Sequence, residues 1–188
     1  QIERMKKLVL AAVMMLSTVA TFAQHEEGSL TIQPRVGINI ANLTKNDGGK
    51  VRLGLAAGAE LEYQVMDILS VSAGAMYSMQ GAKKSGETGK LDYINVPVMA
   101  NVYVVKGLAV KLGLQPGFKI NAKQTSPMGT QKVSDAKAVD LSIPVGLSYE
   151  FKNFVLDGRY NFGLTKVIKD FDYKNSVFQI TAGYKFDI

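Results

Sequence analysis

The sequence of 188 residues contains no cysteine and no tryptophan, and it has only five prolines and one histidine. The absence of cysteine excludes a disulfide scaffold, a thiol nucleophile, a cysteine metal site and a lipid anchor attached to cysteine. The 18 glycines, with few prolines and no tryptophan, favour a β-rich chain over a helical bundle. The length suits one domain that buries a core or closes a small barrel.

The N-terminus has the pattern of an export signal. Basic residues precede an apolar run that starts at Leu8, and Thr21 and Ala23 occupy the −3 and −1 positions of a cleavage site. The run is shorter than the about 18 apolar residues of a membrane-spanning helix, which disfavours an anchor. We predict that residues 1–23, an upstream extension and a signal peptide, are removed after Ala23. Part of the net charge of +6 lies in this segment and is lost with it. We predict no nucleic-acid partner for the remaining chain.

Eight segments of the remaining chain alternate between apolar and polar residues. In the last one, Phe178 and Ile180 alternate with Gln179 and Thr181, the period of two that is typical of a strand with one apolar face. The segments exceed a typical soluble strand of about 5–6 residues and suffice for the about 9–11 residues of a membrane crossing. They are residues 30–43, 52–65, 69–80, 91–105, 108–122, 137–151, 154–165 and 175–188.

The connections between these segments alternate long and short. Residues 44–50, 81–90, 123–136 and 166–174 are the long connections, and tight turns near residues 66–67, 106–107 and 152–153 are the short ones. This alternation is typical of outer-membrane barrels, which have long external loops and tight periplasmic turns. We therefore predict an all-β, eight-stranded, antiparallel, up-and-down transmembrane β-barrel over residues 30–188, after a short polar lead-in at residues 24–29.

The alternative fold is a secreted soluble barrel, a lipocalin-like carrier of a small apolar ligand. Such a barrel has its apolar face inside and a solvent face rich in lysine, glutamate and threonine. Here the polar face is rich in glycine, alanine and serine, which suit the inside of a narrow barrel. The apolar face carries the bulky aliphatic and aromatic residues, as a lipid-facing surface does. The membrane barrel is the favoured interpretation.

Three motifs resemble the PorT-like outer-membrane β-barrel family, among the small eight-stranded barrels of the OmpA and OmpX type. They are Tyr-Ile-x-Val-Pro-Val from Tyr93 to Val98, RVGINIANL at residues 35–43 and ITAGYKF at residues 180–186. Asn95 stands where the family commonly has an acidic residue. The resemblance implies an outer-membrane location, insertion by the outer-membrane assembly machinery with the terminal strand as its signal, and an accessory role in secretion. It supplies no catalytic residues.

The single histidine, His25, gives little support for catalysis. Enzymes that are outer-membrane barrels generally use a histidine near the rim or the lipid face, and a general base must reach the reacting proton. His25 precedes the first strand, so we interpret it as a bystander in a flexible lead-in. No GxSxG, HExxH or P-loop spacing occurs. The sequence therefore predicts a protein that is not an enzyme and has no cofactor and no metal site.

The predicted polar face carries charges of both signs. We interpret them as a network that neutralises itself inside the barrel, because enclosed charges must be paired. The alternative is a narrow porin, in which these residues line a path for small solutes. We disfavour it because eight strands leave room only for side chains. The residues are Arg35, Arg52, Glu60, Glu62, Lys111, Lys119, Asp140, Glu150, Asp157, Arg159 and Lys185.

The four long connections carry a net positive charge and are predicted to face the cell exterior. A cationic rim attracts the phosphates of an anionic headgroup layer, weakly and in a salt-sensitive way. We therefore predict contacts of Lys83, Lys84 and Lys90 with lipopolysaccharide, beside contacts with other outer-membrane lipid. Ordinary solvated loops are the alternative. We predict a monomer with a structural, interaction or secretion-accessory role.

Overall fold

The computed structural model describes residues 25–43, 50–84, 87–132, 137–166 and 174–188, apart from the side chain of Lys84. The predicted signal peptide and its cleavage site lie outside these residues. The strands are β1 (Leu30–Leu43), β2 (Lys50–Met66), β3 (Leu69–Lys84), β4 (Glu87–Asn95), β5 (Val98–Val105), β6 (Leu108–Ser126), β7 (Gly129–Lys132), β8 (Val139–Phe151), β9 (Phe154–Gly163), β10 (Asn175–Tyr184) and β11 (Phe186–Asp187).

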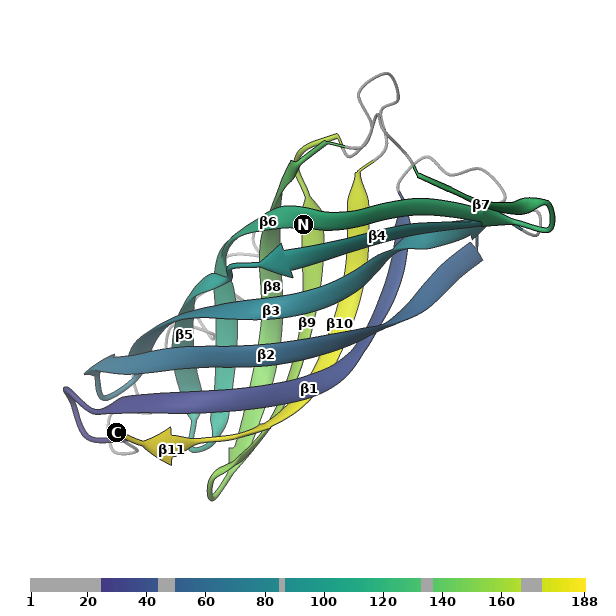
Figure 1. The fold of residues 1–188 in the computed structure, drawn as a ribbon. Coiled ribbons are helices and arrows are strands. Elements are labelled where there is room, and N and C mark those ends of the chain that lie inside the picture. Colours follow the sequence, from purple (N-terminus) through teal and green to yellow (C-terminus); the bar gives the residue numbers. More distant parts are fainter. Residues whose placement is uncertain (1–24, 44–49, 85–86, 133–136, 167–173) are drawn as a thin grey trace, which may run out of the picture.

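The strands form one antiparallel ring (Figure 1). Each strand of the ring pairs with its neighbours along the chain, and β10 pairs with β1 from Leu43–Asn175 to Arg35–Gly183, which closes the ring. A closed ring leaves no unpaired edge in its wall. The predicted all-β, eight-stranded, up-and-down barrel is confirmed. No helix in the described ranges is long and apolar enough to cross a membrane.

Two of the eight ring strands are interrupted and so count as four, and β7 pairs only with β6 outside the ring, which together account for the eleven strands. β4 and β5 both pair with β3 and β6, and the register is the same on either side of Pro97. Proline has no N–H to donate to the ladder, so the strand is interrupted there while its course continues. In the same way β11 continues β10 along β1 beyond Lys185.

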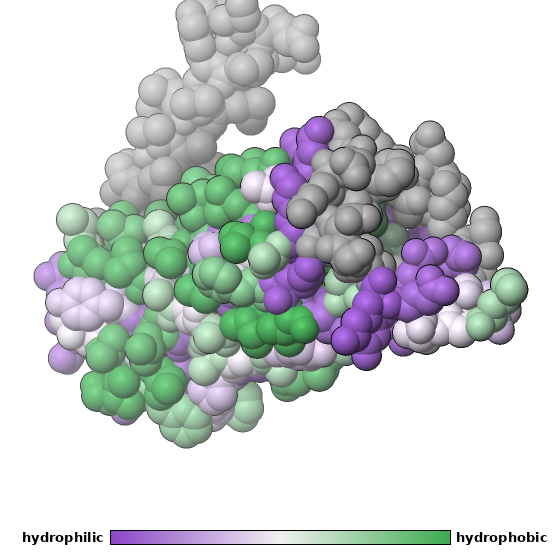
Figure 2. All heavy atoms as spheres, turned by 45° about the horizontal axis from the view of Figure 1, so that its top comes forward, coloured by the Kyte–Doolittle hydropathy of each residue, from purple (hydrophilic) through white to green (hydrophobic). Residues whose placement is uncertain are grey.

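The side chains alternate between a polar interior and an apolar exterior, as predicted. Leu53 and Leu156 on the outer surface are 67% and 58% exposed, whereas Asn39 and Ser70 inside are 0% exposed. Hydrophobic residues cover much of the face seen in Figure 2. The polar residues are therefore the ones that the fold buries, the reverse of a water-soluble domain.

The short turns gather at one end of the barrel, where the lead-in also lies. Gly107 and Lys152 in these turns have positive φ angles of 83° and 57°. Gly28 N donates to Gln64 O at 2.8 Å, and Gln64 N donates to Ser29 O at 3.0 Å. The described part of the lead-in, interpreted from the sequence as flexible, is thus hydrogen-bonded through its backbone to β2.

At the opposite end, two of the predicted loops are largely strand. β3 continues to Lys84, β4 begins at Glu87, β6 continues to Ser126, and β7 folds back on β6 (Figure 1). We call residues 81–84, 87–90, 123–126 and 129–132 the extension. The prediction of loops was wrong because polar residues occupy both faces of these strands, so the apolar alternation stops although the hydrogen-bonded ladder continues.

Candidate functional site

Five charged side chains from four strands meet deep in the barrel interior. Arg159 donates to Asp157 from Nε at 2.7 Å and from Nη2 at 3.0 Å, and from Nη1 to Glu60 Oε1 at 2.9 Å. Lys111 Nζ lies 2.8 Å from Asp157 Oδ2, and Arg35 Nη1 lies 3.2 Å from Glu60 Oε1. These side chains are 0–3% exposed. We call them the central cluster.

Glycines on neighbouring strands make room for the central cluster. Gly146 pairs with Lys111 on one side and with Arg159 on the other. A Cβ at Gly146 would lie 2.8 Å from Arg159 Cβ. Gly74 pairs with Glu60, and a Cβ there would lie 2.6 Å from Glu60 Cγ. Since an eight-stranded barrel has space only for side chains, its long charged residues need glycine opposite them.

A second buried group lies nearer the short turns, around Lys185. Lys185 Nζ lies 2.7 Å from Glu150 Oε2 and 3.0 Å from Glu62 Oε2. Tyr103 Oη donates to Glu62 Oε1 at 2.6 Å and accepts from Lys185 Nζ at 3.0 Å. His25 Nε2 lies 2.8 Å from Glu150 Oε1. We call these residues the turn-end cluster; His25, which the sequence suggested to be a bystander, contacts one of its buried carboxylates.

Arg52 lies outside both clusters and contacts a carboxylate that the sequence analysis missed. Its Nη1 lies 3.4 Å from Asp92 Oδ1 and donates to the backbone carbonyl of Gln80. Strict alternation would place Asp92 on the apolar face. However, the register between β4 and β6 shifts by one residue between Asp92 and Tyr93, and Asp92 is only 6% exposed. The only sequence signal was an acidic residue in an apolar register.

The two remaining predicted interior charges also lie outside the clusters. Asp140 accepts a hydrogen bond from Thr165 Oγ1 at 2.5 Å and another from Asn175 Nδ2 at 2.7 Å. Uncharged donors therefore bind this carboxylate. The predicted network would instead pair it with a cation. Lys119 is half-buried on β6, more exposed than the residues of the two clusters.

The two clusters together are electrically neutral. The central cluster has three cations and two anions, while the turn-end cluster has Lys185 with two carboxylates, so each sign occurs four times when His25 is neutral. Buried charges persist only when they are paired and hydrogen-bonded. Because the charges in the two clusters balance, these side chains can occupy the barrel interior without leaving a net buried charge. In the described ranges, no three acidic or histidine residues are grouped to hold a metal ion.

A different kind of site occurs on the extension, where lysines stand in register. Lys90 of β4 pairs directly with Lys123 of β6, which pairs directly with Lys132 of β7. Directly paired residues project from the same face of a sheet. Three like charges therefore stand side by side across three strands, an arrangement that destabilises a sheet unless an anion is present.

Two further lysines share this face. Lys50 pairs with Lys83, which pairs with Thr88, and Thr88 is two residues from Lys90 on β4. We call Lys50, Lys83, Lys90, Lys123 and Lys132 the lysine face. None of these lysines forms an ion pair with a residue that the structure describes.

The opposite face of the extension has a different character. Glu87 lies there and accepts a hydrogen bond from Gln124 Nε2 at 2.5 Å. Hydrophilic side chains gather at this end of the molecule (Figure 2). Of the three lysines singled out in the sequence, Lys83 is exposed, Lys90 is half-buried, and the side chain of Lys84 lies outside the description. Cross-strand register, which sequence alone does not supply, brings Lys50, Lys123 and Lys132 to the same face.

Residues 22–169 match the family model described as outer membrane protein beta-barrel domain. The chain belongs to this family. A search of curated proteins found none that matches this outer-membrane barrel.

Solved structures of other barrels share the fold. Ail, the attachment invasion locus protein of Yersinia pestis, is 23% identical, with a TM-score of 0.55 over 86% of this chain and 100% of that one. Neisserial surface protein A is 16% identical, with a TM-score of 0.56 over 85% and 100%. OprG from Pseudomonas aeruginosa is 15% identical, with a TM-score of 0.50 over 89% and 100%. At these identities the likeness concerns the fold alone.

Family membership fixes the surroundings of this barrel. It lies in an outer membrane, so the apolar outer surface faces lipid. The soluble lipocalin-like alternative is excluded, because its apolar side chains would face inward whereas Leu53 and Leu156 face outward. In outer-membrane barrels the short turns face the periplasm and the long connections face the exterior. By this rule we expect the turn-end cluster on the periplasmic side and the extension on the cell surface.

Proposed function

We propose that this protein is a closed, non-catalytic barrel of the cell surface whose lysine face binds the phosphate groups of lipopolysaccharide. The row of Lys90, Lys123 and Lys132 in cross-strand register carries the proposal. Lysines directly opposite one another repel, and a multiply charged anion lying across the row turns this repulsion into attraction. Lysine also suits phosphate as a compact point charge with three donors.

The position of the lysine face favours a headgroup of the outer leaflet as the source of the anion. The lysine face continues the polar interior face of the barrel, because Lys90 lies two residues from Asp92 on β4 and Lys123 lies two residues from Asn121 on β6. The extension rises from the rim of a barrel whose outer surface is lipid-facing, so the headgroup layer is the anionic surface nearest to it. Exposed charges attract one another over about 8–10 Å at physiological ionic strength. We therefore expect binding that weakens as salt is added.

The two interior clusters support a closed barrel rather than the narrow porin. A conducting path needs a wider ring or a lumen lined by one sign of charge. Here Glu60, Asp157 and Arg159 are 1% exposed and bonded to one another across the interior. A solute would have to break these buried pairs to pass.

Other predictions from the sequence stay predictions. They include the lipopolysaccharide contact of Lys84, the monomeric state, the removal of residues 1–23 and insertion by the outer-membrane assembly machinery. The secretion-accessory role implied by the PorT-like resemblance belongs with them. A lysine face occupied by lipopolysaccharide is compatible with that role.

The test replaces Lys90, Lys123 and Lys132 together with glutamine and measures lipopolysaccharide that co-purifies with the folded barrel, across a range of salt concentrations. The control replaces Lys106 and Lys152, exposed lysines at the short turns, with glutamine as well. We expect the triple variant to lose most of the bound lipopolysaccharide and its salt dependence, and the control to keep both. Equal amounts of lipopolysaccharide on both variants would contradict the proposal.

A further inference from the structure

A hollow on the lipid-facing surface has Gly158 at its floor. Gly158 lies in the middle of β9, pairs with Leu147 of β8 and Ile180 of β10, and points outward with them. A Cβ at Gly158 would meet no atom within 4 Å, and its φ angle is not positive. Neither crowding nor backbone conformation therefore requires glycine here, although glycine weakens a strand.

The contrast with the adjacent glycine shows that Gly158 serves the outer surface. Gly146 is its neighbour on β8 and faces the interior, where a Cβ would lie 2.4 Å from Gly158 O and 2.8 Å from Arg159 Cβ. Gly146 is thus needed for packing inside the barrel. Gly158 instead leaves an open space on the outer surface. Any larger residue at this position would fill part of that space.

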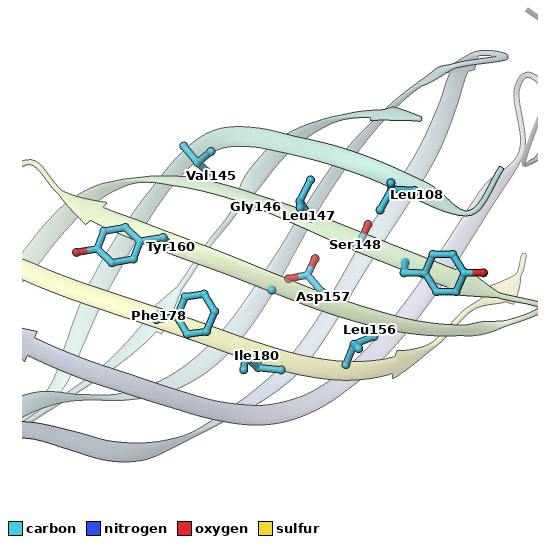
Figure 3. Close-up of a pocket in the computed structure, with 12 residues that line it drawn as sticks. Leu108, Val145, Gly146, Leu147, Ser148, Leu156, Asp157, Tyr160, Phe178 and Ile180 are labelled. Atoms are coloured by element: carbon cyan, nitrogen blue, oxygen red, sulfur yellow. The ribbon is translucent and has the colours of Figure 1, made fainter. Parts of the chain in front are cut away.

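Large apolar side chains wall this space, which has a volume of about 510 Å³. Figure 3 shows the side chains around it, which project from β8, β9 and β10 and, at one end, from β6. Val145, Leu147 and Leu156 in the wall are 39%, 54% and 58% exposed. The remaining large side chains of the wall are Leu108, Tyr149, Tyr160, Phe178 and Ile180.

The geometry points to a bound acyl chain of a phospholipid from the periplasmic leaflet. Hydrocarbon chains are the medium around this surface, and an unfilled apolar hollow forfeits dispersion contacts along its lining. The hollow runs from Val145, Tyr160 and Phe178 past Gly158 to Leu108 and Tyr149, and this last end lies beside the short turn at Gly107. A chain therefore enters it from the periplasmic headgroup layer, where an interfacial tyrosine such as Tyr149 is favoured.

The shape of the hollow disfavours a second copy of the barrel as its occupant. Close approach of two membrane-embedded proteins uses stripes of small residues that let the backbones meet. Gly158 instead has Leu156 and Tyr160 on either side of it along β9 and Leu147 and Ile180 directly across from it. These walls admit a thin flexible chain and hold another barrel away.

The experiment fills the hollow and counts the lipids that the purified barrel retains. Gly158→Val adds a side chain that favours strand, so the variant is expected to fold, which a change in gel mobility on boiling verifies. Ala75→Val, at an exposed position on β3, is the matched control. Native mass spectrometry should find one phospholipid retained by the wild type and by the control, and none by Gly158→Val.

Every other result overturns the inference. Equal phospholipid retention in all three proteins, or none in any, shows that the hollow does not hold a chain. A retained mass that corresponds to lipopolysaccharide would place the ligand in the wrong leaflet. A wild-type dimer that Gly158→Val abolishes would identify a second copy as the occupant.

A fluorescence measurement in bilayers makes the inference independent of detergent. The sequence has no tryptophan, so Tyr149→Trp at the rim of the hollow becomes the only indole. Brominated-chain phospholipid should quench it more strongly than it quenches Tyr63→Trp on β2. Adding Gly158→Val should reduce the quenching of Tyr149→Trp to the level of Tyr63→Trp; unchanged quenching contradicts the inference.

Discussion

The central cluster predicts a large and specific loss of stability when Glu60 is replaced by glutamine. The substitution keeps the size of the side chain and removes its charge. The wild-type cluster has three cations and two anions. In the variant, Arg35, Lys111 and Arg159 share the single carboxylate of Asp157, so repulsion among buried cations is no longer balanced.

The expected magnitude follows from the bonds that Glu60 makes. Its Oε1 accepts from Arg159 at 2.9 Å and from Arg35 at 3.2 Å, and its Oε2 lies 3.8 Å from Lys111 Nζ. A hydrogen bond to a charged group contributes about 1.5–3 kcal/mol. Removing one partner of a buried ion pair destabilises a protein by about 3–5 kcal/mol. We therefore expect the free energy of unfolding to fall by about 3–5 kcal/mol in Glu60→Gln.

The same reasoning predicts partial rescue by a second substitution. Arg35 Nε and Nη2 are buried without a hydrogen-bond partner among the described residues, so Arg35 is less fully bonded than Arg159. Adding Arg35→Gln to Glu60→Gln restores an excess of one cation. The double variant should therefore be destabilised by less than the sum of the two single variants.

Urea unfolding of the barrel in lipid vesicles, followed by gel mobility without boiling, measures these free energies. Lys106→Gln, an exposed substitution at a periplasmic turn, is the control and should change stability by no more than about 0.5 kcal/mol. A loss below about 1 kcal/mol in Glu60→Gln, or strict additivity in the double variant, would refute the argument from buried charge.

Three further outcomes follow from the interior. Tyr103→Phe removes the hydroxyl between Glu62 and Lys185 and should lower the free energy of unfolding by about 1–3 kcal/mol in the same urea assay; a neutral effect would show that the hydroxyl is replaceable. Gly146→Ala should destabilise the barrel in that assay because its Cβ would crowd Arg159, and wild-type stability would contradict the packing described here. The purified barrel should give no steady single-channel current in a planar bilayer; reproducible ion-selective steps would restore the porin interpretation.

The membrane-spanning part of the fold was predictable because its physics is local. Each strand has one face toward lipid and one toward the interior, so the period of two appears in the sequence itself. β1 was predicted at its observed bounds, Leu30–Leu43. The extension was missed because polar residues occupy both of its faces, so no alternation distinguishes its strands from loops.

Part of the candidate site was equally readable from the sequence. Alternation placed Arg35, Glu60 and Arg159 on the interior face, where the structure has them buried. Alternation fails wherever the ladder is irregular, because a shift of one residue exchanges the two faces. This is why strict alternation from Ile94 onward would put Asp92 on the apolar face, although it is buried in the interior.

The sequence by itself determined the class of fold, the number of membrane crossings, and which face of each strand is polar and which is apolar. These properties depend only on the order of residues along each strand. The tertiary structure decided which residues meet. The partners of Glu60, the contact of His25 with Glu150 and the row from Lys90 to Lys132 all join strands distant in sequence. Such pairings depend on register and on closure of the ring, and the periodicity of a single strand contains information about neither.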